Sequence, residues 1–463
     1  MSGAAGQPDA GKLPARLLRL SLSLLPIPAL LLLRPLAFTP RQCLILGILL
    51  VVIIWWVTGW VERTAASLVL LAVFFLFSTA PTATILTFPR SENFLIIVLS
   101  FLFSQGISNS GLTRQLFQPL LLYASRSLGK LMAVMALACF AMIFIIPQPF
   151  SRIIVLVLIF RDFWDKIGLK DPLRSTLFFL LFVYSAVLNM TMRRGDLILN
   201  HTMLTMGGVS ISEGDWLRAM ALPTLVFTAL VTLLFLAVFR RELKDFHPPA
   251  SDILAVSTEK LSRKDLRNLL VILLVVVLWA LEDLHGISGT VIVTLGTAVL
   301  FPLGLLHLSD LRTINVKLLV FLTAAFSIGG VLKAVGVADV LFQQLATLFP
   351  ETFSLRYVAL VLGISMAMHM LLGSNVTTMS VVVPGLMAAG AGVTAEPVLL
   401  LLIYLGICGH FLFPFHHVLL LLGEGDGCYT SLQTFRLGLP LTLVTLLCGM
   451  FLYLGWWRLI GLF

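Results

Sequence analysis

Residues 368–384 of the chain read MHMLLGSNVTTMSVVVP. They place small polar side chains, from Ser374 to Thr378, in the middle of sequence apolar enough to lie in lipid. A bilayer offers no water to unpaired N–H and C=O groups, so polar backbone at that depth must be buried in protein or line a wet cavity. Gly373 favours a break in the helix here, and Ser, Asn and Thr side chains can bind an ion or a small anion. The same side chains could instead join two membrane helices through hydrogen bonds.

The composition of the whole chain is typical of a membrane protein. Of its 463 residues 59% are hydrophobic and 11% are charged. Apolar runs near the roughly 20-residue spanning length recur from end to end. The net charge of +9 reflects Lys and Arg in loops, which orient a membrane protein and do not indicate nucleic-acid binding. We therefore expect an all-α polytopic protein surrounded by the lipid bilayer, with no nucleic-acid partner.

The apolar runs predict about 11 transmembrane helices plus two re-entrant helical hairpins. The first helix, at 17–37, is the weakest, because Pro26, Pro28 and Arg34 interrupt it. The chain is predicted to begin with an N-terminal tail and first helix at 1–41, followed by repeat 1 at 42–239. Repeat 1 contains a hairpin at 129–164 and a broken helix at 173–206. A cytoplasmic linker at 240–265 leads to repeat 2 at 266–463, which contains a hairpin at 356–391 and a broken helix at 397–424.

The two halves of the chain repeat one plan. A single gap-free register lays Pro149–Arg152, the polar break of the first hairpin, on Ser374–Thr377 of the second. Farther on, at a shift of 220 residues, Tyr184 matches Tyr404 and Arg194 falls on Pro414, so the breaks of the two helices that follow the hairpins coincide. Matched broken segments in two halves point to a transporter binding site near the bilayer midplane. An odd number of spans separates corresponding elements, so the repeats are predicted to be inverted.

The basic residues orient the chain. The 240–265 linker carries six of them, including Arg240 and Lys264, and cytoplasmic loops are the ones enriched in Lys and Arg. We therefore expect a cytoplasmic N-terminus and linker and an external C-terminus. The membrane expected is the bacterial inner, or cytoplasmic, membrane.

With these features the sequence resembles the divalent-anion/sodium symporter family, which contains dicarboxylate, citrate and sulfate permeases. The resemblance covers about residues 40–463, and four elements carry it: Gly111-Leu112, Gly373–Thr377, Pro414, and the ending from Phe435–Pro440 through Trp456-Trp457-Arg458. It implies a homodimer with an elevator mechanism, in which a scaffold stays in place while both hairpins and both broken helices move as a transport domain.

The departures from the family pattern decide which ion sites to expect. The family has Ser-Asn-Thr at each hairpin tip, and each tip forms one sodium site with the adjacent helix break. The second tip keeps Ser374 and Asn375 but has Val376 in place of Thr, whereas the first tip has Pro149-Phe150-Ser151. The first helix break, a Gly-Thr-Pro-Pro-Asn-like loop in the family, is occupied here by Arg193–Asp196. One sodium ion is therefore expected at most.

The candidate site residues follow from these two tips and breaks. Those expected to bind substrate are Ser374, Asn375, Thr377, Ser151, Arg152 and Arg193, and those expected to bind sodium are Gly373, Asn375 and Pro414. An arginine at membrane depth needs a partner or a wet cavity. The arginines could therefore bind the anion, or could pair internally with Asp196 or with carbonyl groups.

The predicted function is secondary active transport of a small anionic solute, such as a di- or tricarboxylate or sulfate, coupled to a cation or working by exchange. A cation/proton antiporter that uses Asp196, and a non-transporting scaffold or sensor, are the alternatives. A membrane enzyme using His416 and His417 would lack a paired acid or nucleophile. The sequence has no Walker A, GxSxG or HExxH motif, so no enzymatic activity and no cofactor beyond sodium are expected.

Overall fold

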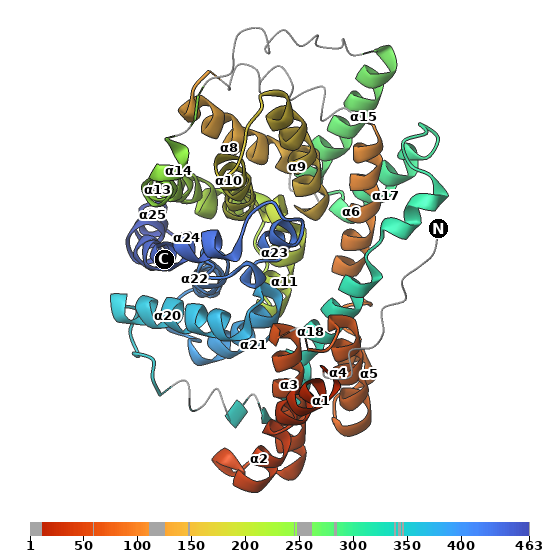
Figure 1. Ribbon diagram of the computed structural model, residues 1–463. Helices are drawn as coiled ribbons and strands as arrows, with labels where there is room; N and C mark the ends of the chain where they lie inside the picture. Colours follow the sequence, from red (N-terminus) through yellow and green to blue (C-terminus); the bar gives the residue numbers. More distant parts are fainter. Residues whose placement is uncertain are drawn as a thin grey trace. The chain divides into compact units, whose positions relative to one another are not determined.

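The computed structural model describes residues 12–58, 60–110, 126–146, 149–244, 246–247, 262–281, 285–337, 339–340, 344 and 347–462. Every regular element in these ranges is a helix, as the sequence predicts (Figure 1). The chain forms two compact units, one made of Met1–Pro89 with Val316–Thr347 and the other of Arg90–Asn315 with Leu348–Phe463. The first unit thus combines a segment from each half of the chain.

The predicted first helix of the first unit is split into two. Helix α1 (Lys12–Ser23) ends before α2 (Pro26–Leu33) begins. A proline cannot donate a backbone hydrogen bond and collides with the preceding turn, so it is tolerated only where a helix begins. Helix α2 then ends at Arg34, whose φ of 41° is left-handed. Pro26, Pro28 and Arg34, which interrupt the predicted span, therefore lie at the start and the end of α2.

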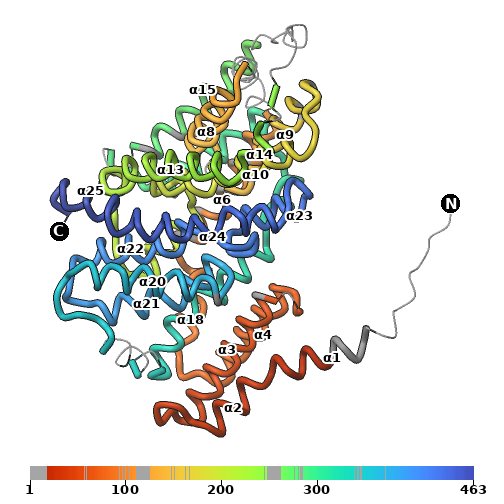
Figure 2. The backbone as a smooth tube through the Cα atoms, turned by 60° about the vertical axis from the view of Figure 1, so that its left-hand side comes forward, coloured from red at the N-terminus to blue at the C-terminus, as the bar shows by residue number. Residues whose placement is uncertain are grey.

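The other helices of this unit pack around close backbone contacts. They are α3 (Pro40–Thr58), α4 (Arg63–Phe77), α5 (Thr82–Ile85) and α18 (Val316–Ala334). Helix α3 lies beside α2 and α4, and α18 lies beside α4 and α5 (Figures 1 and 2). A Cβ at Gly47 of α3 would lie 3.0 Å from the Ile27 Cα of α2, so only a small residue allows this approach.

The second unit holds both hairpins and both broken helices. Its other helices are α6 (Glu92–Asn109), α12 (Glu213–Trp216), η4 (Leu217–Ala221), α13 (Leu222–Val238), α14 (Arg240–Leu243), α15 (Arg263–Ala280), α17 (Gly289–Leu300), η6 (Leu308–Thr313), α24 (Ser431–Leu447), η8 (Cys448–Tyr453) and α25 (Leu454–Leu459). Helices α13 and α24 lie side by side in both views (Figures 1 and 2). Several large apolar side chains of this unit are strongly exposed, among them Leu233, Leu270 and Leu439. So many exposed leucines would be unusual on the surface of a soluble protein, and they suit a surface that faces lipid.

Five helical segments of the described chain are long and apolar enough to cross a membrane. They are Leu128–Ile145, Leu173–Thr191, Glu213–Val238, Val316–Ala334 and Ser431–Leu459, and several shorter apolar helices accompany them. The chain is therefore an integral membrane protein, and the larger predicted number of spans stays a prediction. The Gly111-Leu112 motif and most of the 240–265 linker lie outside the described residues.

Each predicted hairpin range contains two helices joined by a short connection. The first hairpin consists of α8 (Leu128–Ile145) and α9 (Pro149–Lys166), and Pro147 and Gln148 between them lie outside the described residues. The second consists of α20 (Leu355–Leu372) and α21 (Asn375–Ala389). In the second, Gly373 and Ser374 mark where the first helix stops and the chain turns back.

The broken helices pack against the hairpins. In the first, α10 (Leu173–Leu188) is followed by the short η2 (Asn189–Thr191) and η3 (Arg193–Asp196) and by α11 (Leu197–Gly207). In the second, α22 (Glu396–Cys408) is followed by η7 (Pro414–His416) and α23 (Val418–Gly425). Helix α10 lies against α8 and α9, while α22 lies against α20 and α21. Nearly every side chain of α10 and α22 is buried, so these two helices are enclosed by protein on all sides.

Candidate functional site

The tip of the second hairpin is a tight turn made by one glycine. Helix α20 ends at Gly373, whose φ of 67° lies in the left-handed region that side chains with a Cβ disfavour. The Gly373 N–H donates to the His369 carbonyl at 2.9 Å and so closes the last turn. Ser374 then extends the chain, and α21 begins at Asn375. The turn places the N-terminus of α21 at the tip.

Three side-chain oxygens at this tip are buried and have no hydrogen-bond partner in the described structure. They are Ser374 Oγ, Asn375 Oδ1 and Thr377 Oγ1. The exposed fractions of these side chains are 6%, 0% and 0%. Ser374 occupies the N-cap position without using its hydroxyl to cap the helix. A buried polar atom without a partner is costly, so three at one turn make this tip a candidate binding site.

The Asn375 amide connects the tip to the second broken helix. Its Nδ2 donates to the Ile407 carbonyl at 3.2 Å and approaches Cys408 Sγ at 3.5 Å. This bond takes up the amide nitrogen and leaves Oδ1 directed elsewhere. Pro414 begins η7 beyond this point, and its carbonyl accepts the His417 N–H at 3.2 Å. The predicted sodium ligands therefore come from the hairpin tip and the adjacent helix break, and their coordination of an ion stays a prediction.

Histidines line the second helix break. His369 Nδ1 lies 3.4 Å from His410 Nε2, and His369 Nε2 lies 3.0 Å from the His416 carbonyl, which can only accept. His416 Nδ1 accepts the backbone N–H groups of Leu412 and Phe413, and His417 Nδ1 caps α23 at Leu419. His416 and His417 thus satisfy backbone groups freed by the break. In the part of the chain that the structure describes, no three His, Cys, Asp or Glu side chains form a metal-binding group.

The first hairpin has a different tip. Ser151 lies in the first turn of α9, and its side chain is outside the described part of the structure. Arg152 is 1% exposed and donates to the Ile146 carbonyl at 3.2 Å, to Asn189 Oδ1 at 2.8 Å and to the Gly195 carbonyl. Of the two options left open by the sequence, the structure thus gives Arg152 internal oxygen partners.

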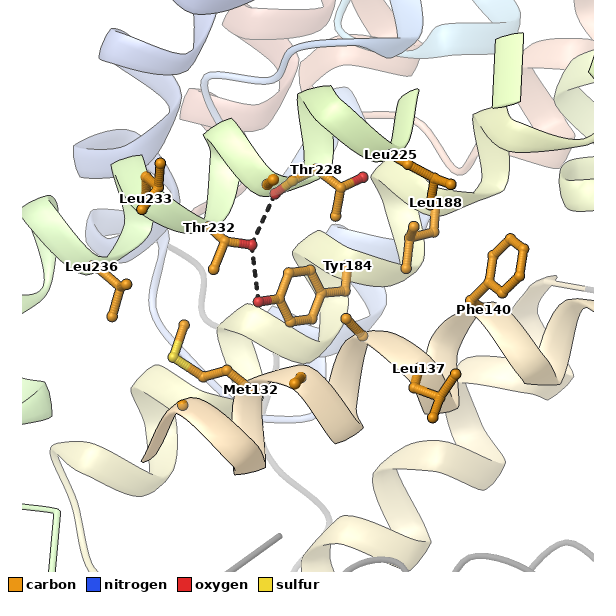
Figure 3. Close-up of a pocket in the computed structure, with 14 residues that line it drawn as sticks. Met132, Leu137, Phe140, Tyr184, Leu188, Leu225, Thr228, Thr232, Leu233 and Leu236 are labelled. Atoms are coloured by element: carbon orange, nitrogen blue, oxygen red, sulfur yellow. Dashed lines mark hydrogen bonds between the residues drawn. The ribbon is translucent and has the colours of Figure 1, made fainter. Parts of the chain in front are cut away.

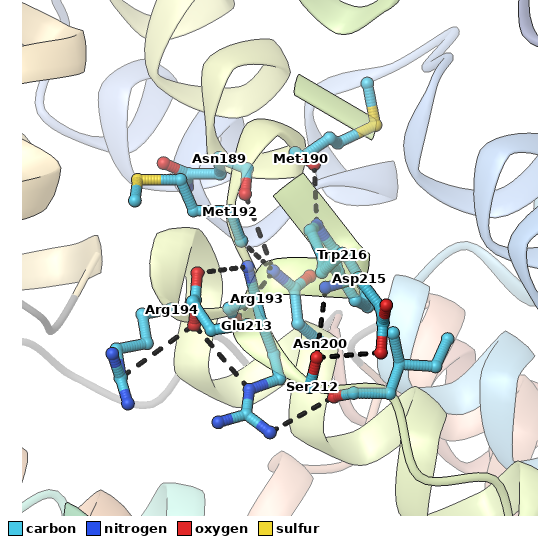
Figure 4. A network of polar contacts seen from close by, with 11 residues as sticks. Asn189, Met190, Met192, Arg193, Arg194, Asn200, Ser212, Glu213, Asp215 and Trp216 are labelled. Atoms are coloured by element: carbon cyan, nitrogen blue, oxygen red, sulfur yellow. Dashed lines mark hydrogen bonds and ion pairs between the residues drawn. The ribbon is translucent and has the colours of Figure 1, made fainter. Parts of the chain in front are cut away.

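The first helix break holds an arginine pair around one carboxylate (Figure 4). The Arg193 N–H donates to Glu213 Oε1 at 3.1 Å, while its Nε lies 3.6 Å from Glu213 Oε2. Arg194 Nε lies 3.8 Å from the same oxygen, and its guanidinium stacks on Trp279 with 5.3 Å to the ring centroid. The Arg193 guanidinium also donates to the Ile211 carbonyl at 3.1 Å. These contacts explain how two adjacent arginines are accommodated.

Glu213 is the residue that sequence reasoning missed. It lies in the acidic segment 210–215, which reads as a loop outside the membrane, yet it is only 4% exposed. Glu213 is the carboxylate that Arg194 contacts at 3.8 Å, while Asp196 Oδ1 accepts the N–H groups of Ile198 and Leu199 at 3.1 and 3.0 Å and caps α11. Only the Ser212-to-Asp215 spacing, a helix-start signal, hinted that this segment enters a helix.

A second unpredicted contact joins the two broken helices. Asn200 of α11 donates to the carbonyls of Met192 and Arg193, each at 3.0 Å, and its oxygen accepts the Tyr404 hydroxyl of α22. The Asn200 and Tyr404 side chains are both buried. A single Asn within an apolar run carries no sequence signal that distinguishes this linkage from any other interhelical hydrogen bond.

One pocket of the second unit is not suited to an anion. It has a volume of about 610 Å³ and lies among α8, α10 and α13 (Figure 3). Its lining is apolar except for Tyr184, Thr228 and Thr232, and the Tyr184 and Thr232 hydroxyls lie 3.0 Å apart. No basic side chain lines it. Since a desolvated anion needs a compensating charge or several donors, the hairpin tips are the better candidates.

Comparison with known proteins shows the family of the chain. Among solved structures, the transporter YdaH of Alcanivorax borkumensis, described as having an unusual topology, is 14% identical, with 91% of this chain and 98% of that chain covered and a TM-score of 0.47. No curated protein matches the sequence. The family model that describes the sodium:sulfate symporter transmembrane region matches residues 15–463. The chain therefore belongs to the sodium:sulfate symporter family.

Proposed function

We propose that this secondary transporter carries a small anionic solute, either a di- or tricarboxylate or sulfate, together with one sodium ion bound at the second hairpin tip. Family membership supports secondary transport in general. One structural observation carries the finer proposal: Ser374 Oγ, Asn375 Oδ1 and Thr377 Oγ1 are buried at one tip without hydrogen-bond partners in the described structure. This tip has groups that can bind both proposed ligands, the sodium ion and the anion.

The three oxygens suit sodium, which, like other hard cations, prefers neutral and anionic oxygen ligands. Asn375, Ser374 and Thr377 would hold the ion, and Gly373 and Pro414, the other residues that the sequence predicts for the sodium site, would add their backbone carbonyls. Bound there, sodium supplies one positive charge beside the anion. Asn375 is fixed for this role by its bond to Ile407, so its oxygen loses little freedom when a ligand binds.

The same tip offers groups for the anion. The first N–H groups of α21 have no partner within the helix, and the N-terminus of a helix carries a partial positive charge. Helix α21 runs for 15 residues, long enough for this effect. The hydroxyls of Ser374 and Thr377 can donate as well as accept. Arg193 and Ser151 of the first half are expected to face the anion from the other side.

A dimer with an elevator mechanism is part of the proposal. Each hairpin packs on its own broken helix, and Asn200 ties the first broken helix to α22 of the second through Tyr404. Two hairpins and two broken helices linked in this way can move as one body. The antiporter alternative is less well supported, because its carboxylate, Asp196, already accepts two backbone N–H groups as the cap of α11, and these bonds are stronger to the ionised carboxylate than to the protonated one.

Uptake by purified protein in liposomes tests the proposal. Radiolabelled sulfate, succinate and citrate are offered with an inward sodium gradient, or with choline in place of sodium. We expect at least one anion to accumulate with sodium and to be lost when the gradient is dissipated. If none of the anions enters under either condition, the protein is a scaffold or carries another class of solute, and the proposal is wrong.

A further inference from the structure

The Arg152 guanidinium lies inside a cage of oxygens. Ile146, at the end of α8, provides one backbone carbonyl, and Gly195 of the helix break provides another. Asn189, at the end of α10, provides its side-chain oxygen at 2.8 Å. The cage therefore combines the hairpin tip with the adjacent helix break. The side chain that fills it is 1% exposed, so it has almost no contact with solvent or with a solute.

Such a set of ligands is what a free cation would require. Two carbonyl oxygens and one amide oxygen are hard, neutral ligands, and the nearby Asp196 adds an electrostatic attraction. An arginine is permanently charged and has five N–H donors, so it can satisfy several oxygens at once. A buried positive charge is otherwise expensive at membrane depth. The guanidinium provides donors for the three oxygens, and the oxygens stabilise its buried positive charge.

The corresponding position of the second half is built in the opposite way. The register that relates the two hairpins lays Thr377 on Arg152, and each residue lies in the first turn of the returning helix. Thr377 is too short to reach across to a helix break. Its hydroxyl is buried without a hydrogen-bond partner in the described residues, as are Ser374 Oγ and Asn375 Oδ1. One half thus carries its cation on a side chain, and the other leaves oxygens unsatisfied.

We propose that Arg152 is a tethered cation, whose guanidinium permanently occupies the cation position of the first hairpin. The first half then takes up no free cation, and a charge that never leaves holds this tip to the helix break throughout the cycle. The complementary statement, that the second tip binds a free cation, rests on the function proposed above, whereas the statement about Arg152 does not. Arg152 is then a positioning residue and does not contact the anion.

The experiment is thermal unfolding of purified Arg152→Ala with chemical rescue. The variant leaves three buried acceptors without a donor, and we expect Tm to fall by roughly 5 °C in choline chloride. Guanidinium chloride at millimolar concentration, far below its denaturing range, should restore much of that loss by entering the empty cage. Wild type should gain nothing. The control is Arg218→Ala, which removes an exposed arginine that donates to the Ile460 carbonyl at 2.7 Å.

Two outcomes would overturn the proposal. One is an Arg152→Ala protein as stable as wild type, and the other is rescue by guanidinium no greater than for Arg218→Ala. If Arg152→Ala does not accumulate, the variants Arg152→Lys and Arg152→Gln replace it. The lysine variant keeps a positive charge, so it should unfold at a higher temperature than the glutamine variant. A higher unfolding temperature for the glutamine variant would refute a role for the charge. This readout needs no transport, so its failure is distinct from the failure of sodium to stabilise wild type.

Discussion

Asn375→Ala separates a ligand-binding role of the second tip from a structural one. The side chain makes one hydrogen bond to the Ile407 carbonyl, at 3.2 Å, and a weaker contact with Cys408 Sγ, at 3.5 Å. Its Oδ1 has no partner in the described structure. The substitution thus removes little that stabilises the fold and removes the one side-chain amide oxygen proposed for the ion.

The substitution should change stability only slightly and sodium affinity strongly. Interhelical hydrogen bonds in membranes contribute about 0.6 kcal/mol on average. Loss of both contacts should therefore destabilise the protein by about 1 kcal/mol and lower Tm by less than ~4 °C. A polar contact with a charged partner contributes about 1.5–3 kcal/mol. Its loss should weaken sodium binding by about 10- to 150-fold.

The assay is the rise in Tm of purified protein as sodium chloride replaces choline chloride at constant ionic strength. The concentration that gives half of the full rise measures sodium affinity and requires no known substrate. Asn268→Ala is the matched control, because Asn268 of α15 is also buried and its Oδ1 also lacks a partner among the described residues. An Asn375→Ala protein with the wild-type sodium midpoint would refute the site.

Three further predictions concern the first helix break and the topology. Gly195→Ala should lower the folded yield, because the added Cβ would collide with the Asn189 carbonyl; Gly455→Ala, where a Cβ meets nothing, separates this collision from a general effect of the substitution. Glu213→Gln should destabilise the protein by about 3–5 kcal/mol, because it leaves the buried Arg194 and the partly buried Arg193 without their carboxylate; unchanged urea or thermal stability would contradict this. A cysteine at Ser257 should resist membrane-impermeant thiol reagents in intact cells, and labelling from outside would reverse the predicted orientation.

Much of the architecture follows from polar residues within apolar runs. Ser374 and Asn375 in the second hairpin, and the Arg193–Asp196 segment in the first broken helix, lie where the structure interrupts its helices. Backbone groups at a break need partners within the protein, so the side chains that supply them stand out against a hydrophobic background. This local signal is why sequence analysis could point to both tips.

The partners of these side chains could not be predicted in the same way. Arg152 bonds to backbone carbonyls, which every residue has, so its cage has no sequence signature. Glu213 pairs with Arg193 across 20 residues and from a segment that looks like an exposed loop. Both contacts depend on how the helices pack, and no local pattern records that packing.

The number of sodium ions bound by each chain tests the central claim most directly. Purified wild-type protein is titrated with radioactive sodium to saturation in choline buffer, and the bound ions are counted per chain, with Asn375→Ala measured alongside. One ion per wild-type chain, with binding greatly weakened in Asn375→Ala, is the result that we predict. Two ions would mean that the first hairpin binds a free cation despite Arg152, and no bound ion would mean that the unpartnered oxygens of the second hairpin serve another purpose.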